Sequence, residues 1–149
     1  MSPRVRSATV RFYIDADLLG LARVLAGLRS DVTFPGDPGG IIFKRQRPPC
    51  PIQPGALDVD WLPETARHQW LVITRDRNIQ QHTREIAAVR DHGARMVVLA
   101  GADARGKFEQ LEVVMCRWRD IEKCLDEPGP FIYQASRTRF TPVDLEKAH

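Results

Sequence analysis

Aspartate residues stand at or next to the ends of two largely apolar segments that are typical of buried strands. Residues 10–14 are followed by Asp15 and then Asp17, and residues 70–74 are followed one residue later by Asp76. The carboxyl ends of neighbouring parallel strands meet at one edge of an α/β sheet, and such sheets place their chemistry there. Carboxylates without histidine or cysteine among them are typical of sites for hard cations such as Mg²⁺ or Mn²⁺. This spacing favours metal-assisted phosphodiester chemistry.

Two further acids, Asp58 and Asp60, stand at the start of a helix predicted over residues 60–69. One of their carboxylates can cap that helix by accepting a hydrogen bond from a free backbone N–H, which leaves the other to face the crevice. A turn or cap role is also open to Asp15 and Asp76, because aspartate is common in turns. The coincidence of acids at two strand ends favours the metal site over this simpler interpretation.

Cations cluster in three segments. The first contains Lys44, Arg45 and Arg47, the second contains Arg75 and Arg77, and residues 137–139 form the third. Cations around a group of carboxylates suit a site that cleaves a polyanion, although each cluster is equally compatible with an ordinary solvated surface. The formal net charge of +3 indicates a mild preference for anionic partners.

The elements that must position these residues alternate along the chain. Apolar periodicity predicts helices over 17–28, 60–69, 78–92 and 107–125, and apolar, β-branched segments predict strands over 10–14, 70–74, 95–100 and 131–134. Asp17 is placed to cap the first helix. This alternation predicts a mainly parallel sheet with helices on both faces. The last strand is expected at the edge, residues 31–35 as a short strand, and about 36–56 as a long irregular loop rich in proline and glycine.

Composition excludes several classes of protein. With 149 residues, 43% hydrophobic and 28% charged, the chain is expected to form one globular domain over residues 1–149. No apolar run approaches the roughly 20 residues of a membrane helix, and no secretory signal is evident. The three cysteines have neither zinc nor disulfide spacing, so we expect reduced thiols, a cytoplasmic location and no membrane partner.

Three segments together resemble the PIN-like domains, namely residues 12–20, 58–63 and 72–79. Within that family they are most similar to the virulence-associated-protein-C-like toxins typical of actinobacteria. The resemblance extends over about residues 10–135, and its most specific part is the Thr-Arg-Asp segment. It implies a three-layer α/β/α sandwich whose acidic residues bind Mg²⁺ or Mn²⁺, and an enzyme that cuts single-stranded RNA.

The resemblance also assigns roles to individual acids. Asp15 and Asp76 match the first and third acidic positions, and Asp58 or Asp60 matches the middle one, with Asp58 favoured as the ligand and Asp60 as the helix cap. Asp103 is the candidate for a fourth acid. A toxin-type ribonuclease implies a cognate antitoxin as protein partner, and relatives commonly form homodimers.

The same reasoning places the cations and leaves two alternatives open. Arg75 or Arg77 would hold the RNA backbone, and Lys44, Arg45 and Arg47 would extend the electrostatic track. The middle acid is an aspartate where classical members usually carry glutamate, so one alternative is a catalytically silent PIN-like module that binds nucleic acid or a protein. The other is a structural subunit in which the acids only cap helices.

Overall fold

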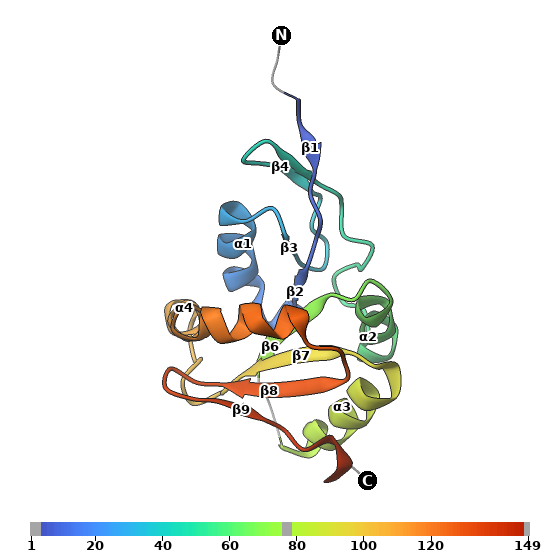
Figure 1. The fold of residues 1–149 in the computed structure, drawn as a ribbon, viewed down its shortest axis with the longest axis vertical. Helices are drawn as coiled ribbons and strands as arrows, with labels where there is room; N and C mark the ends of the chain where they lie inside the picture. The colour runs from blue at the N-terminus through green and yellow to red at the C-terminus, as the bar shows by residue number, and fades with distance from the viewer. Residues whose placement is uncertain (1–3, 76–78, 148–149) are drawn as a thin grey trace.

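The computed structural model describes residues 4–75 and 79–147, and within these ranges only the backbone is described for Asp58, residues 79–85 and Lys147. In this part of the chain a six-stranded sheet forms the centre of the molecule (Figure 1). Its strands, in spatial order, are β3 (Val32–Thr33), β2 (Phe12–Ile14), β6 (Leu71–Arg75), β7 (Arg95–Leu99), β8 (Phe131–Ala135) and β9 (Phe140–Pro142).

The pairing is parallel from β3 through β8, and only β9 runs antiparallel to its neighbour. This confirms the predicted mainly parallel sheet. The prediction that residues 131–134 form an edge strand is wrong, because β9 pairs with β8 on its outer side. The Phe140 ring stacks on that of Tyr133 with centroids 4.7 Å apart, a contact that the short segment Phe-Thr-Pro does not reveal from its sequence.

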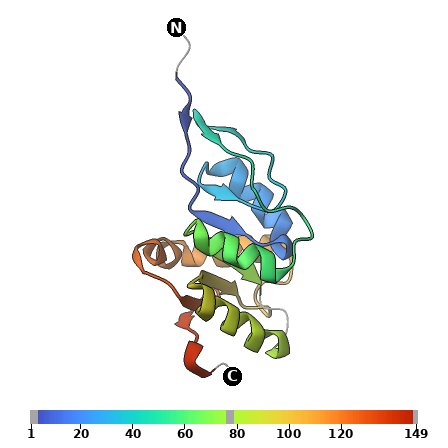
Figure 2. The ribbon, with the colours of Figure 1, turned by 90° about the vertical axis from the view of Figure 1, so that its right-hand side faces the viewer.

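Helices cover both faces of the sheet, as predicted (Figures 1 and 2). On one face, Phe12 and Ile14 of β2 pack with α1 (Leu19–Leu28) and α4 (Lys107–Lys123). On the other face, Tyr13 packs with α2 (Asp58–Arg67) and α3 (Ile79–His92). Alternate residues of a strand point to opposite faces, so a continuous apolar strand fills both cores. Short 3₁₀ helices complete the fold: η1 (Ala16–Leu18), η2 (Cys124–Asp126) and η3 (Leu145–Lys147).

A second sheet projects from one end of the molecule (Figures 1 and 2). Within the described residues it has three strands, in the order β1 (Arg6–Ser7), β5 (Arg45–Arg47) and β4 (Gly40–Ile42). The prediction of an irregular loop over about 36–56 is therefore wrong for residues 40–47. The hairpin was missed because Phe43 and Lys44 form its two-residue turn, a place where Asn-Gly is the usual signal.

Across residues 4–75 and 79–147, the structure contains no helix that combines the length and the apolar character needed to cross a membrane.

Candidate active site

The candidate site lies where β2 and β6 end side by side. These strands are parallel neighbours in which Ile14 pairs with Ile73, and the Asp15 backbone N–H donates to the Ile73 carbonyl at 3.0 Å. This register brings Asp15 next to Thr74, the next residue of β6. The residue described beside Asp15 at this edge is thus a threonine, and Asp76, the acid predicted to meet Asp15, lies outside the described residues.

Asp15 is almost fully buried, with 4% of its surface exposed, and both of its carboxylate oxygens accept hydrogen bonds. Oδ1 accepts from the Ala16 backbone N–H at 2.7 Å and caps η1, while Oδ2 accepts from the Thr74 hydroxyl at 2.9 Å. The cap is therefore Asp15, and the prediction that Asp17 caps the first helix is wrong. Two short bonds hold this carboxylate in one orientation.

Asp17 joins the same group. It is half-buried in η1, and both of its carboxylate oxygens lie 3.5 Å from Thr74 Oγ1. A hydroxyl has one hydrogen to donate, and the shorter distance gives that hydrogen to Asp15. The structure thus gathers two carboxylates around one hydroxyl. Sequence reasoning gave Thr74 no role, although the Asp-x-Asp pair after β2 and the Thr-Arg-Asp sequence that starts at Thr74 were the available signals.

Two of the predicted ligands lie outside what the structure describes. Asp76 follows β6 directly and falls outside the described residues, as does Arg77. Asp58 is the first residue of α2, and its side chain is not among those described.

Asp60 does not cap α2 as predicted. The helix begins at Asp58, two residues earlier than the apolar periodicity indicated, and its N-cap is Leu57, which makes no side-chain capping bond. Asp60 occupies the third helical position, where its backbone N–H donates to the Leu57 carbonyl at 2.9 Å and its side chain is exposed. An acid in the first turn still interacts favourably with the helix dipole.

Asp103, the predicted fourth acid, is engaged elsewhere. Its Oδ2 accepts from the Arg137 backbone N–H at 3.1 Å and lies 3.7 Å from Arg137 Nε. These contacts tie the segment after β7 to the turn between β8 and β9. In the described part of the chain there is no group of three or more aspartate, glutamate, histidine or cysteine side chains that could hold a metal ion.

The side chain of Lys107 lies across the first turn of α1 at Gly20, which follows Asp15 and Asp17 closely in the chain. A Cβ built on Gly20 would lie 2.5 Å from Lys107 Cε and 2.6 Å from its Cδ, so the lysine stem passes where any larger residue would have a side chain. Lys107 begins α4, which follows the carboxyl end of β7. Beside it, Phe108 is 75% exposed. A cation and an aromatic ring thus lie at the same edge of the sheet as Asp15.

Arg75, the last residue of β6, carries a further donor. Its Nε is buried and has no hydrogen-bond partner among the described residues. A buried donor without a partner costs free energy, so an anion bound at this edge would find a favourable contact there.

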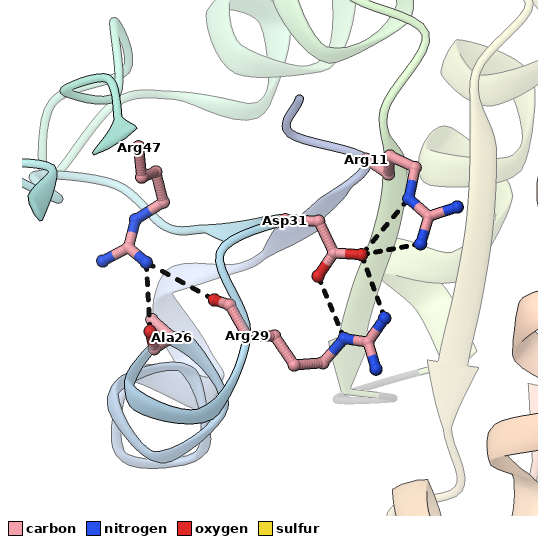
Figure 3. A network of polar contacts seen from close by, with 5 residues as sticks. All are labelled: Arg11, Ala26, Arg29, Asp31 and Arg47. Carbon is pink, nitrogen blue, oxygen red and sulfur yellow. Dashed lines mark hydrogen bonds and ion pairs between the residues drawn. The ribbon is translucent and has the colours of Figure 1, made fainter. Parts of the chain in front are cut away.

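The predicted basic segment does not belong to this site. Arg47 is buried, with 6% of its side chain exposed, and its Nε donates to Asp37 Oδ2 at 2.7 Å. Figure 3 shows the bond from its Nη1 to the Ala26 carbonyl, at 3.0 Å. The prediction that Arg47 contacts RNA is therefore wrong, because its donors bind α1 and a buried carboxylate. Lys44 and Arg45 are exposed in the hairpin, which lies beyond the amino end of β2 (Figure 1). Asp15 follows the carboxyl end of the same strand.

The donor set at the strand ends suits a hard cation. Carboxylate and hydroxyl oxygens are the ligands that Mg²⁺ and Mn²⁺ prefer, and the carboxylates of Asp15 and Asp17 both lie within 3.5 Å of the Thr74 hydroxyl oxygen. The described residues of this site thus include two acids whose chemistry fits such an ion.

The chain was compared with known proteins. The family of PIN-like domains matches residues 10–101, a stretch that begins before β2 and ends just after β7 and so includes Asp15, Asp17 and Thr74. No curated protein matches the chain, and no solved structure matches it.

Proposed function

Because the chain belongs to the PIN-like domain family, whose members are typically nucleases, we propose that it is a metal-dependent endoribonuclease that cuts single-stranded RNA. The observation that supports this most directly is the convergence of Asp15 and Asp17 on the Thr74 hydroxyl at the carboxyl ends of β2 and β6. In open α/β sheets, ligands bind at this edge.

In this proposal Asp15 and Asp17 hold Mg²⁺ or Mn²⁺ together with Asp76, which follows β6, and Asp58 is the further candidate from α2. The bound ion would supply a water of lowered pKa and neutralise charge on the scissile phosphate. Thr74 is a positioning residue, since its hydroxyl bond keeps Asp15 Oδ2 in place. The Ala16 N–H does the same for Oδ1.

Cations at the same edge would hold the RNA backbone. Arg75 has a buried Nε without a partner among the described residues, and Lys107 is held over Gly20. Arg77, next to Asp76, is the remaining sequence candidate. Each such contact contributes to affinity in a manner that weakens with salt.

We further propose that the chain is the toxin of a toxin–antitoxin pair of the virulence-associated-protein-C-like kind and acts in the cytoplasm as a homodimer. The three-segment resemblance supports this proposal. A basic side chain of the antitoxin inserted among the acids would make strong charge-assisted hydrogen bonds. Expression should then arrest growth, co-expression of the adjacent gene product should relieve the arrest, and Asp15→Asn should abolish it.

The decisive experiment incubates purified protein with an end-labelled single-stranded RNA pool in Mn²⁺ or in EDTA. We expect the wild type to cleave the RNA in Mn²⁺ and not in EDTA. The variants Asp15→Asn and Asp17→Asn should not cleave it in either condition. Asp91→Asn is the matched control, since Asp91 is an exposed acid on α3 that pairs with Arg90. Equal cleavage by all four proteins would assign the activity to a contaminant and contradict the proposal.

The contacts of Asp103 support a second candidate function, a catalytically silent PIN-like module that binds nucleic acid or a protein. Arg137 holds this acid in a structural contact, so it does not contribute to an ion site. RNA binding by the wild-type protein without cleavage in either Mg²⁺ or Mn²⁺ would favour this module over the nuclease.

A further inference from the structure

A groove of about 540 Å³ lies at the opposite end of β2 from Asp15. One wall is the hairpin, with Phe43 and Arg45, and the other is the segment that links α1 to β3. Arg11, Arg29 and Asp31 also line the groove. Three arginines against one aspartate make it electropositive.

The charges in the groove are already ordered. Arg11 donates to Asp31 through Nε at 3.2 Å and Nη2 at 2.8 Å, and Arg29 donates through Nε at 2.9 Å and Nη2 at 3.0 Å (Figure 3). One carboxylate therefore orients two guanidinium groups and leaves each with further N–H donors. Arg45 is exposed and has no ion-pair partner among the described residues. The groove thus carries a surplus of positive charge.

The hairpin tip is strained and prominently exposed. Phe43 and Lys44 have φ of 51° and 62°, in the left-handed region that non-glycine residues rarely occupy. Phe43 is 78% exposed, so burial of its own ring does not explain its presence in the turn. Strained conformations persist where the surrounding structure holds them, and they concentrate at functional sites.

The base of the hairpin is firmly anchored while its tip is free. Arg47, at the end of β5, forms an ion pair with Asp37. It also donates to the carbonyl of Ala26 near the end of α1 (Figure 3). Asp37 in turn accepts from the Thr33 hydroxyl of β3 at 3.0 Å. The strained turn therefore presents an aromatic ring and a cation from a rigid support, which lowers the entropy lost when a ligand binds.

We propose that this groove and the Phe43–Lys44 turn bind single-stranded nucleic acid, with an unpaired base stacked on Phe43 and phosphates on Arg45, Arg11 and Lys44. Proteins that hold single strands combine a positively charged groove with exposed aromatic rings, which is the combination found here. Arg11 precedes β2 and Asp15 follows it, so the length of this strand separates the groove from the acids. At about 3.3 Å per residue, that separation is roughly 13 Å. The groove would hold a segment of the strand remote from the acidic site.

The test measures binding by fluorescence anisotropy in EDTA, so that it does not depend on cleavage. The probe is a labelled single-stranded RNA of about 12 nucleotides, within the usual site range. The first variant, called the turn variant, is Phe43→Asn, which removes the ring and leaves Lys44 in place; asparagine tolerates the left-handed conformation of this turn, so thermal stability should be kept. We expect binding to weaken roughly tenfold, the loss typical of one base stack.

A second variant, Lys44→Ser with Arg45→Ser, tests the charge. The slope of log affinity against log salt should become shallower by about 1.4, at about 0.7 per phosphate contact. The matched control is Arg139→Ser, in the turn before β9 on the far edge of the six-stranded sheet, which should leave affinity nearly unchanged. The same RNA annealed to its complement should lose its sensitivity to the turn variant, since its bases are no longer free to stack.

Three outcomes would overturn the inference. The first is a wild-type protein that binds no single-stranded RNA in EDTA, and the second is a turn variant with wild-type affinity and salt slope. The third is a turn variant whose only change is a smaller assembly by light scattering, which would assign the hairpin to contact between two copies of the chain. Binding without cleavage by the wild type would contradict the proposed nuclease but leave this inference standing.

Discussion

A single hydroxyl organises the acidic site at the scale of the residue. Thr74 and Asp15 are 59 positions apart in the chain, yet the hydroxyl donates to a carboxylate that is 4% exposed. Burying a carboxylate costs free energy unless it is hydrogen-bonded. Thr74 therefore supports both the stability of this edge and the orientation of the carboxylate that would face a cation.

Replacing Thr74 with valine tests that role, because valine has nearly the same shape and no hydroxyl. We expect Thr74→Val to lower the free energy of unfolding by about 1–3 kcal/mol, the usual cost of leaving a buried hydrogen-bond acceptor without its donor. Urea denaturation followed by fluorescence would measure this. Thr138→Val, at an exposed position in the turn between β8 and β9, is the control. Equal stability of both variants would show that the Thr74 hydroxyl is not needed.

Asp31 provides a prediction about pH. Burial by itself would raise the pKa of this carboxyl, but the hydrogen bonds from Arg29 and Arg11 outweigh burial and hold the pKa below its ordinary value of 3.8. A lowered pKa in the folded state stabilises the protein above the unfolded-state pKa. That stabilisation is lost as the pH falls through the folded-state pKa.

We therefore expect Asp31→Asn to be less stable than the wild type at pH 7 and the difference to shrink below about pH 4. Thermal unfolding between neutral and acidic pH would follow this. Asp144→Asn, an exposed acid that accepts from the Glu146 backbone N–H, is the control. A stability difference that is the same at every pH would mean that Asp31 contributes through its shape and not through its charge.

At the scale of the element, the hairpin depends on one buried ion pair. Arg47 and Asp37 are 6% and 1% exposed at the side chain, and their N–O distance is 2.7 Å. Removing one partner leaves the other charge buried, which costs about 3–5 kcal/mol. We expect Arg47→Ser to destabilise the protein strongly, whereas Arg45→Ser on the same strand should cost less than about 0.5 kcal/mol.

Calorimetry of the two variants would test this contrast, and Arg47→Met with Asp37→Leu provides the balancing variant. If Arg47→Ser destabilises the protein because the Asp37 carboxylate is left buried without a partner charge, removing both charges should recover part of the stability. A double variant that is less stable than Arg47→Ser alone would mean that the hydrogen bonds to α1 and β3 matter more than the charges.

Alanine substitutions at two glycines of helix α1 should have different effects on stability. A Cβ at Gly20 meets the stem of Lys107, whereas a Cβ at Gly27 meets nothing within 4 Å. Gly27→Ala should therefore stabilise the helix by about 0.5–1 kcal/mol. Gly20→Ala should gain less, because it displaces the lysine side chain from the turn next to Asp17.

A double-variant cycle would test whether this displacement affects activity. If Lys107 contacts the RNA backbone, Gly20→Ala should lower RNA cleavage in the wild-type background and have no further effect in Lys107→Ala. Gly27→Ala should leave cleavage unchanged in both backgrounds. A loss of activity from Gly20→Ala that persists in Lys107→Ala would assign the effect to the helix itself.

At the scale of the whole molecule, the acidic edge predicts that stability depends on divalent cations. An ion that binds only the folded state stabilises it by about 2.7 kcal/mol at one hundred times its dissociation constant. We expect Mn²⁺ to raise the midpoint of thermal unfolding in the wild type and in Asp91→Asn. The rise should be lost in Asp15→Asn and reduced in Asp17→Asn. The same response to Mn²⁺ in all four proteins would exclude a site at Asp15.

Local patterns in the sequence determined most of the architecture. Apolar periodicity predicted α1, α2, α3 and α4 to within a few residues, and continuous apolar segments predicted β2, β6, β7 and β8. These patterns are readable because helix and strand periods place apolar residues on buried faces. The order of elements then favoured a parallel sheet, and a parallel sheet by itself predicts a functional edge near Asp15.

Only the tertiary structure decided which side chains meet at that edge and which do not. Strand register brings Thr74 to Asp15, and the hydrogen bond to Ala16 shows that Asp15 itself is the cap. Burial of Arg47 against Asp37 separates it from the exposed cations beside it. The hairpin turn at Phe43 adopts a conformation that its residues disfavour. Such features depend on contacts between distant segments, and no local pattern encodes them.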